Sequence, residues 1–389
     1  MAKIEELLAK GVVIPAPGSV EIGAEVATEN IAPGVVLRAG TKISGAETSI
    51  GPGCELGAET PVAVEDCQLG EGVKLKGGYF AGAVFLDGAA MGSGAHVRAG
   101  TILEEGAEMA HTVGLKQTIF FPYCVSGSLI NFCDVLMSGG TSRKVHSEIG
   151  SSYIHFNYTP RGDKATASLV GDVPRGVMLD QPPIFLGGQG GMAGPVRVEY
   201  GTVVAAGCVL RKDVLVGGQL VIPPAPRAGQ GPFSRTYLNV SRVVKNCAIY
   251  LGNIAALDTW YRTVRPDAMD ATPWGARCRA GALKQLAAVR KERLKRLDAL
   301  VSAVASESRE GMADTLASAH AELAAAWPAK YEQLSKAGDV ECPEREAFLA
   351  EWRRGTGGYI DRIHALSPEA KAAGTAWLQK IVDRAADGF

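Results

Sequence analysis

The stretch YFAGAVFLDGAAMGSGAHVRAGTILEEGAEMAHTVGL, residues 79–115, carries an apolar residue at every sixth position, with small residues between. A period of six differs from the 3.6 of an amphipathic helix and from the 2 of a simple strand. It is typical of a parallel β-helix, in which each six residues make one short strand and one turn. Glycine permits the left-handed turns at the corners of such a coil. The apolar series is Tyr79, Phe85, Met91, Val97, Leu103, Met109 and Leu115.

The same rhythm continues on both sides of this stretch. Three hexads would close one triangular coil, with the apolar residue of each pointing inward. Residues 118–190 carry the rhythm only in fragments, which predicts inserted external loops. We therefore predict a short linker helix over residues 1–11 and a β-helix over 12–225. The flanking series are Ile31, Leu37 and Ile43; Ile50, Leu56 and Val62; and Val198, Val204, Leu210, Val216 and Ile222.

The composition changes after a proline- and glycine-rich linker, residues 226–235. From residue 236 to 389, alanine, leucine and charged residues recur at helical spacing, which predicts an all-α domain. Residues 250–265 mix aromatics with arginines and are expected to pack against the β-helix. The basic run at 290–298 contains interleaved acids, so a solvated helix face is favoured over nucleic-acid binding. The expected helices are 236–264, 283–307, 310–336, 343–364 and 367–386.

The overall composition excludes several classes of protein. The formal net charge is −1, so nothing draws the chain to nucleic acid or to an anionic membrane. No apolar run approaches the roughly 20 residues needed to span a bilayer, and the N-terminus lacks the apolar core of a signal peptide. We therefore expect a cytoplasmic protein. The 8 cysteines form no CxxC pair and are expected to be reduced and packed as small hydrophobes.

Polar residues interrupt the scaffold between Asn131 and Asp172. His146 could act as a base, since the pKa of imidazole lies near neutral pH, or be a solvated loop histidine. His155 lies in an alternating strand pattern and could face a site or pack in the core. The neighbours Arg143 and Lys144 could hold a phosphate or be ordinary solvated charges. The two histidines lack a third metal ligand at suitable spacing, so no metal site is predicted.

Residues 1 to about 216 resemble the C-terminal acetyltransferase domain of bacterial N-acetylglucosamine-1-phosphate uridyltransferase/glucosamine-1-phosphate acetyltransferase. ELLAKGVVIPAPGSVEIGAEV, IAPGVVLRAGTKISG and SIGPGCELG resemble that family's entry coils. Its NF and NY…K…T…GD elements resemble Asn131-Phe132 and the series Asn157-Tyr158, Lys164, Thr166 and Gly171-Asp172. Its closing coils resemble Phe185-Leu186-Gly187, Ala193-Gly194-Pro195-Val196 and Val204-Ala205-Ala206-Gly207.

The resemblance implies a left-handed parallel β-helix that forms homotrimers and transfers acetyl from acetyl-CoA to an amino sugar phosphate or nucleotide sugar. His146 would be the general base. The implied substrate-binding residues are Asn131, Arg143, Lys144, His155, Asn157, Tyr158 and Lys164. The implied cofactor-binding residues are Gly188, Ala205, Ala206 and Arg211.

Several positions depart from the family pattern. Leu136 occupies the place of the lysine that holds the sugar phosphate, Thr159 that of an aspartate, and Gly188 that of a serine. About two hexads between the histidine and the NY pair are absent, and so is the uridyltransferase half. Three alternatives therefore stay open: a sugar-nucleotide-binding or pyrophosphorylase-related protein without its own nucleotidyltransferase domain, a non-catalytic trimeric scaffold, and a metal-dependent hexapeptide enzyme.

Overall fold

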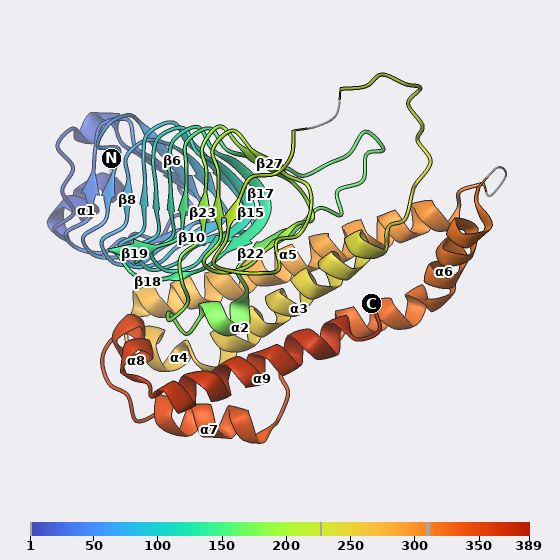
Figure 1. Ribbon diagram of the computed structural model, residues 1–389. Coiled ribbons are helices and arrows are strands. Elements are labelled where there is room, and N and C mark those ends of the chain that lie inside the picture. Colours follow the sequence, from blue (N-terminus) through green and yellow to red (C-terminus); the bar gives the residue numbers. More distant parts are fainter. Residues whose placement is uncertain (1, 226–227, 309–311) are drawn as a thin grey trace.

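The computed structural model describes residues 2–225, 228–308 and 312–389. They form a parallel β-solenoid of about 11 turns, followed by a helical region. In Figure 1 the helices lie along one side of the solenoid, and α3, α5 and α9 run in the direction in which the coils stack. The predicted fold class, a parallel β-helix with a C-terminal all-α region, is confirmed.

Three faces make up the solenoid, and each is a ladder of short parallel strands. The first face contains β1 (Glu21–Ile22), β3 (Lys42–Ser44), β6 (Val62–Glu65), β9 (Gly78–Ala81), β12 (Ala95–Arg98), the first parts of β15 (Gly114–Phe120) and β17 (Asn131–Met137), β21 (Ile154–Phe156), β24 (Gly191–Ala193) and β27 (Val209–Leu210). The second face contains β2 (Val36–Leu37), β5 (Glu55–Leu56), β8 (Lys74–Leu75), β11 (Ala90–Met91), β14 (Glu108–Met109), β16 (Val125–Ser126), β20 (Glu148–Ile149), β23 (Phe185–Leu186), β26 (Val203–Val204) and β28 (Leu220–Val221). The third face contains β4 (Ser49–Ile50), β7 (Gln68–Leu69), β10 (Ala83–Phe85), β13 (Thr101–Leu103), the last parts of β15 and β17, β22 (Ser168–Val170) and β25 (Arg197–Val198). Helix α1 (Ala2–Ala9) lies at the N-terminal end, where Ile4 and Leu7 are buried, and the single turns η1 (Pro17–Ser19) and η2 (Thr28–Asn30) join early coils.

The inner positions of the faces follow the predicted rhythm with two corrections. Phe80, not Tyr79, points into the first face, because Phe80 is fully buried whereas Tyr79 is 37% exposed. Near the C-terminal end, Val214 pairs with Val198 and Val221 with Val204, so Val216 and Ile222 are left exposed. The coils also continue through residues 118–190, where the chain alternates strands with loops.

The first and third faces meet at a corner where one residue adopts a left-handed backbone. At Gly100, with φ of +83°, a Cβ would lie 2.6 Å from Cγ of Gln117 and 3.1 Å from Cγ2 of Val289. Glycine therefore leaves room both for the next coil and for a helix packed on the corner. The corner residues of successive coils are Gly45, Asp66, Gly82, Gly100, Gln117 and Asp134.

Helices form in all five predicted segments, although they begin at residue 241 instead of 236, at 273 instead of 283 and at 314 instead of 310. Residues 310 and 311 of the expected helix, and residues 226 and 227 of the expected linker, lie outside the described residues. The expected helix 343–364 is two helices, because the glycine-rich turn 355–358 interrupts it. Ser367 caps the last helix, since its Oγ accepts from Ala370 N at 3.1 Å. The helices are α2 (Val173–Gly176), which lies between β22 and β23, then α3 (Ser241–Thr263), α4 (Pro266–Met269), α5 (Pro273–Ala305), α6 (Asp314–Ser335), α7 (Pro343–Trp352), α8 (Tyr359–Ala365) and α9 (Pro368–Ala386). None of the helices in the described ranges is long and apolar enough to cross a membrane.

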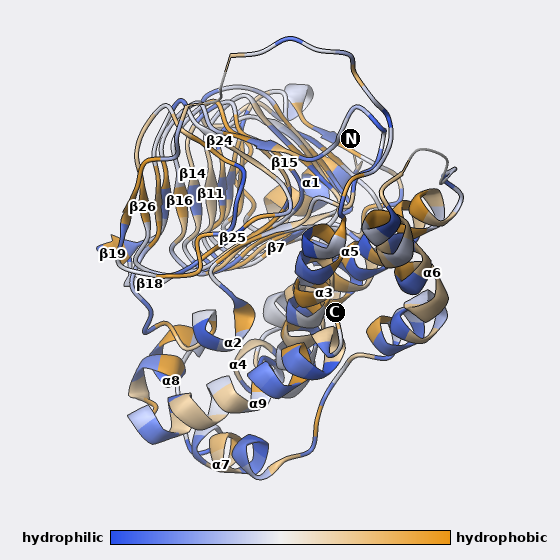
Figure 2. Ribbon diagram, turned by 45° about the vertical axis from the view of Figure 1, so that its right-hand side comes forward, coloured by the Kyte–Doolittle hydropathy of each residue, from blue (hydrophilic) through white to orange (hydrophobic). Residues whose placement is uncertain are grey.

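Helices α3 and α5 cover the third face of the solenoid (Figure 2). On this face the outward position is apolar as well as the inward one, so the face presents a second hydrophobic row. Gly281 of α5 lies so close that a Cβ there would be 3.1 Å from Cγ2 of Val84. The outward row is Val84, Ile102, Ile119, Leu136 and Leu169.

A buried charged cluster anchors the helical region to the solenoid. Tyr261 Oη donates to Glu104 Oε1 at 2.6 Å, and Arg265 lies 3.0 Å from Glu104 Oε2 and also pairs with Glu105. The Arg265 guanidinium stacks 3.3 Å above the Tyr359 ring. Burial raises the pKa of Glu104 to about 7, against the opposing attraction of Arg265. Residues 250–265 thus pack against the β-helix, as expected.

The basic run at 290–298 is not simply a solvated face. Arg290 donates to the carbonyl of Leu334 at 2.9 Å near the end of α6, and Arg293 is only 6% exposed. The sequence predicts that both arginines lie on one helix. Their hydrogen-bond acceptors belong to distant segments and could not be predicted from it.

Candidate active site

A hairpin carries His146 away from the solenoid between its third and second faces. Its strands are β18 (Gly140–Ser142) and β19 (Val145–His146), with Gly140 opposite His146. A Cβ on Gly140, which has φ of +93°, would lie 2.5 Å from Cα of His146. The glycine therefore allows the two strands to approach closely and fixes His146 at the edge of the second face.

The hydrogen bonds of His146 define the state of its ring. Nδ1 lies 2.9 Å from the backbone oxygen of Arg143, and a carbonyl oxygen only accepts, so Nδ1 carries the proton. In the neutral ring Nε2 therefore holds the lone pair, and Glu148 Oε2 lies 4.0 Å from it. The imidazole is partly exposed, at 24% of its side chain. This tautomer can take up a proton at Nε2, and the nearby carboxylate would stabilise the imidazolium that forms.

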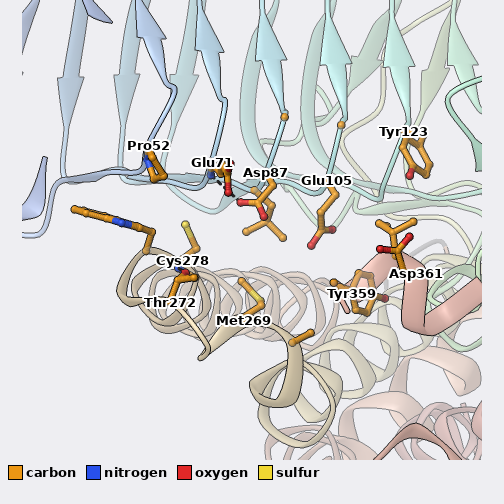
Figure 3. Close-up of a pocket in the computed structure, with 18 of the residues that line it drawn as sticks. Pro52, Glu71, Asp87, Glu105, Tyr123, Met269, Thr272, Cys278, Tyr359 and Asp361 are labelled. Atoms are coloured by element: carbon orange, nitrogen blue, oxygen red, sulfur yellow. Dashed lines mark hydrogen bonds between the residues drawn. The ribbon is translucent and has the colours of Figure 1, made fainter. Parts of the chain in front are cut away.

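Arg143 and Lys144 extend from the same hairpin. Both side chains are exposed, and Arg143 lies 2.9 Å from Glu108 Oε2 on the second face. Arg143 also lines a cleft of about 430 Å³ between the solenoid and helices α4, α5 and α8. In Figure 3 Glu71, Asp87 and Glu105 project from neighbouring coils toward this cleft.

The cleft has acidic and aromatic walls. Burial raises the pKa of Asp87, whose carboxylate accepts from the backbone N–H of Glu71 at 2.8 Å. Tyr359 and Asp361 face these carboxylates from α8 (Figure 3). The field of these carboxylates disfavours the phosphates of a nucleotide cofactor in this cleft. The sequence analysis did not predict this cleft, although the acidic residues that line it recur about one coil apart in the chain.

A second group of predicted residues lies on the first face. Asn131 is exposed there, next to Gly114 in one coil and Ile154 in the following coil. Lys116 and Arg98 also lie on the first face, where they are register partners on adjacent parallel strands of neighbouring coils. Lys116 was predicted as a possible replacement for the lysine that holds the sugar phosphate, whereas Arg98 was not among the predicted binding residues. Only their spacing of one coil could have signalled that they share a surface.

The segment after β21 carries the predicted asparagine–tyrosine pair. Asn157 Nδ2 donates to Asp134 Oδ2 at 3.3 Å, and Tyr158 is 67% exposed. The backbone oxygen of Lys164 accepts from Arg293 at 3.2 Å. The segment therefore lies at the corner of the first and third faces, in contact with α5.

His155 lies inside the solenoid, at the inner position of the first face. Its Nδ1 lies 2.5 Å from the carbonyl oxygen of Cys133, and its Nε2 lies 2.8 Å from Ser168 Oγ. Burial lowers the pKa of His155 to about 4, so the ring is neutral at pH 7. Both nitrogens are engaged within the protein, and the structure places this residue in the core rather than against a substrate.

The predicted cofactor residues lie mainly along the corner between the second and first faces. Gly188 accepts there from Gly207 N at 2.9 Å, and Ala205 and Ala206 belong to the next coil. A Cβ on Gly187 would lie 2.4 Å from the nitrogen of Ala206, so small residues are needed where these coils stack. Arg211 is exposed at the other end of the first face.

Leu136, at the position of the family's phosphate lysine, is fully buried in the outward row of the third face. The helical region packs on this row, so a charged lysine here would be buried without water. In this chain the position instead forms part of the apolar row on which the helices pack.

Two comparisons with known proteins gave no match, either to a family model or to a curated protein. Among solved structures, the polysialic acid O-acetyltransferase OatWY is 13% identical, over 54% of this chain and 80% of that chain, with a TM-score of 0.17. A likeness this weak carries no argument about function.

Within one chain the predicted residues form two groups on different edges. His146, Arg143 and Lys144 border the second face, whereas Asn131 and the segment after β21 border the first. Across residues 2–225, 228–308 and 312–389, no group of three or more His, Cys, Asp or Glu side chains is placed to hold a metal ion. A reaction that used residues from both groups would require the two edges to be brought together.

Proposed function

We propose that this chain is a CoA-dependent acyltransferase that acts as a homotrimer and acetylates an amino sugar phosphate or a nucleotide sugar. The observation that carries the proposal is the state of His146. Its Nδ1 proton is committed to the carbonyl of Arg143 at 2.9 Å, which leaves Nε2 as a partly exposed proton acceptor.

A second subunit would bring the two groups of residues together. The third face is covered by the chain's own helices, which leaves the first and second faces to meet a neighbour. Both carry exposed apolar side chains near the candidate residues: Phe156 is 45% exposed on the first face, and Phe185 is 38% exposed on the second. Exposed apolar surface of this kind marks interfaces. Packing the second face of one subunit on the first face of the next would bring His146 toward the neighbour's Asn157, because the two residues lie at the outer edges of those faces.

The reaction at such a site follows from the residues present. The acceptor amine attacks the thioester carbonyl carbon of acetyl-CoA, forming a C–N bond, while Nε2 of His146 takes the amine proton. The tetrahedral intermediate then collapses, the C–S bond breaks, and the imidazolium returns the proton to the leaving thiolate. Glu148, 4.0 Å from Nε2, stabilises the imidazolium between these steps. General base catalysis of this kind contributes about 10²–10⁴-fold to the rate.

Charges and small residues on the remaining surface support the assignment of the two substrates. Arg98, Lys116 and Arg211 lie on the first face and offer cations for phosphates. The corner with Gly188, Ala205 and Ala206 lets an extended pantetheine arm approach the backbone closely. With Leu136 buried, Arg143 or Lys116 would replace the family's lysine as the group that holds a sugar phosphate.

The test is release of free CoA. Purified protein is incubated with acetyl-CoA and glucosamine 1-phosphate, then with a panel of amino sugars and nucleotide sugars, and the thiol is detected with a chromogenic reagent. His146→Ala should lower kcat about 100-fold or more with little change in KM. His111→Ala, which removes another exposed histidine, is the control and should leave kcat unchanged. No CoA release across the panel, together with no thermal shift with CoA, would overturn the proposal.

The same experiment separates the alternatives. A sugar-nucleotide-binding protein would be stabilised by nucleotide sugars without turning over acetyl-CoA. A metal-dependent enzyme would lose activity with a chelator. A scaffold would show neither ligand response nor turnover.

A further inference from the structure

The helical region holds the segment that carries the predicted asparagine–tyrosine pair, residues 156–166, which we term the acceptor segment. Ala165 is buried among residues of α3 and α5, and its carbonyl oxygen lies 3.4 Å from Cys247 Sγ. Arg161 donates to the backbone oxygens of Arg235 and Thr236, each at 2.8 Å. The segment is therefore attached to the helical region on more than one side.

A buried ion pair next to the acceptor segment also connects it to the helical region. Arg293 of α5 lies 2.9 Å from Asp134 Oδ2, and the two side chains are 6% and 3% exposed. Asn157 donates to the same carboxylate oxygen at 3.3 Å. Arg293 also donates to the backbone oxygen of Lys164 at 3.2 Å. One guanidinium thus contacts both ends of the acceptor segment, directly at Lys164 and through Asp134 at Asn157.

The position of Asp134 explains why this pair can form. Asp134 is a corner residue with φ of +65°, in the row that also contains Gly100 and Gln117. Helix α5 runs along this corner: Gln285, two helical turns before Arg293, accepts from the backbone N–H of Gly100 at 2.8 Å, and Val289, one turn before Arg293, lies over the same glycine. Eight residues of helix advance about 12 Å and two coils about 9.6 Å, so the chain from Gln285 to Arg293 spans the two coils from Gly100 to Asp134. Arg293 arrives at the coil that carries Asp134.

We propose that Arg293 is a positioning residue for the acceptor site, and that the helical region sets the conformation of the acceptor segment through the Arg293–Asp134–Asn157 contact. The role of the segment in binding an acceptor rests on the proposed function. Whether the contact holds the segment in place can be measured independently of that function. It assigns the helical region a role in substrate binding that is absent from a bare β-helix.

A surface arginine on the same helix provides the contrast. Arg296 pairs with Glu292 within α5 at 2.7 Å and is 33% exposed. Its removal takes a charge from α5 without touching the acceptor segment. Both arginines lie within reach of Glu292, at 2.7 Å for Arg296 and 3.9 Å for Arg293, but only Arg293→Met releases Asp134 and Lys164.

The experiment compares Arg293→Met, Arg293→Lys, the double variant Arg293→Met with Asp134→Asn, and the control Arg296→Met. Hydrogen–deuterium exchange is followed in peptides covering residues 156–166, with peptides from 79–115 as an internal reference. We expect exchange in the acceptor segment to rise about tenfold in Arg293→Met and in the double variant, with the reference peptides unchanged. Arg293→Lys should restore part of the protection, because it keeps the charge but loses the planar contact with two oxygens.

The kinetic readout is the KM for the amino sugar. Arg293→Met should raise this KM about tenfold while kcat changes less than about threefold, since the base on the other edge is untouched. Unchanged exchange in both Arg293→Met and the double variant would overturn the contact's role. Faster exchange with an unchanged KM would overturn the positioning role. If the unaltered protein releases no CoA, the proposed function fails, whereas the exchange data still decide whether the helical region holds the segment.

Discussion

Removing the Arg265 side chain should detach the helical region from the solenoid at a defined energetic cost. The side chain of Arg265 is 0% exposed, and its partners Glu104 and Glu105 are 1% and 14% exposed. Breaking a buried ion pair by removing one partner costs about 3–5 kcal/mol, because the remaining charge is uncompensated. Loss of the guanidinium stacked on Tyr359 adds about 1–2 kcal/mol. We therefore expect Arg265→Met to lower the free energy of unfolding by about 4 kcal/mol or more at pH 8.

The effect should depend on pH in a defined direction. The pKa of Glu104 is raised by burial from 4.5 to about 7. A carboxyl with a raised folded-state pKa contributes stability that is complete below its unfolded pKa and is lost as pH rises through the folded value. Without Arg265 the pKa of Glu104 should rise further. The loss of stability in Arg265→Met should therefore be smaller at pH 5 than at pH 8, by at least about 1 kcal/mol.

Urea titration monitored by tryptophan fluorescence measures this loss. Trp260 and Trp352 lie with their ring centroids 6.4 and 6.2 Å from that of Tyr359, so they report on the region that Arg265 anchors. The control is Arg262→Met, three residues earlier in the last turn of α3, where Arg262 is 59% exposed and pairs with Asp258. That change should cost no more than about 0.5 kcal/mol. A loss in Arg265→Met below about 1 kcal/mol at pH 8, or one independent of pH, would refute the reasoning.

Two further predictions concern the solenoid. Because the pKa of His155 is lowered from 6.5 to about 4, stability is complete above pH 6.5 and should fall by up to about 3 kcal/mol as the pH drops to 4; His155→Gln should flatten this slope in urea titrations, and an unchanged slope would argue against a buried neutral ring. Leu136→Lys, which restores the family's residue, should lower the free energy of unfolding by about 3 kcal/mol or more, since the residue is fully buried under the helices, and a Tm equal to that of the unaltered protein would contradict the packing.

The period of six was sufficient to predict the coils but not which of two adjacent apolar residues points inward. Tyr79 and Phe80 are both aromatic, and only stacking on Val64 and Val97 distinguishes the buried Phe80. The series through Val216 and Ile222 failed for a related reason, because a shorter final coil shifts the inner positions to Val214 and Val221. Spacing alone does not report such changes in coil length.

The sequence does contain a pattern that marks the face on which the helices pack. A search for one apolar residue in every six does not detect it, because the pattern consists of two adjacent apolar residues. The pairs Val84-Phe85, Ile102-Leu103, Ile119-Phe120 and Leu136-Met137 are apolar at both positions, whereas most first-face strands pair one apolar with one polar residue. The ion pairs of Arg265 with Glu105 and of Arg293 with Asp134 could not be predicted, because each joins residues more than 150 positions apart in the chain. The candidate site residues could each be identified in the sequence. That they lie on two different edges of the solenoid could be learned only from the structure.

The most direct test of the proposed site is complementation between two inactive variants. His146→Ala lacks the base, and the double variant Asn157→Ala with Tyr158→Ala lacks the acceptor contacts. If each active site combines the second face of one subunit with the first face of the next, co-refolding equal amounts should create intact sites in about one quarter of positions. We predict CoA release from the mixture at about that fraction of the unaltered rate, with each variant alone inactive. A mixture no more active than its components would contradict a site shared between subunits.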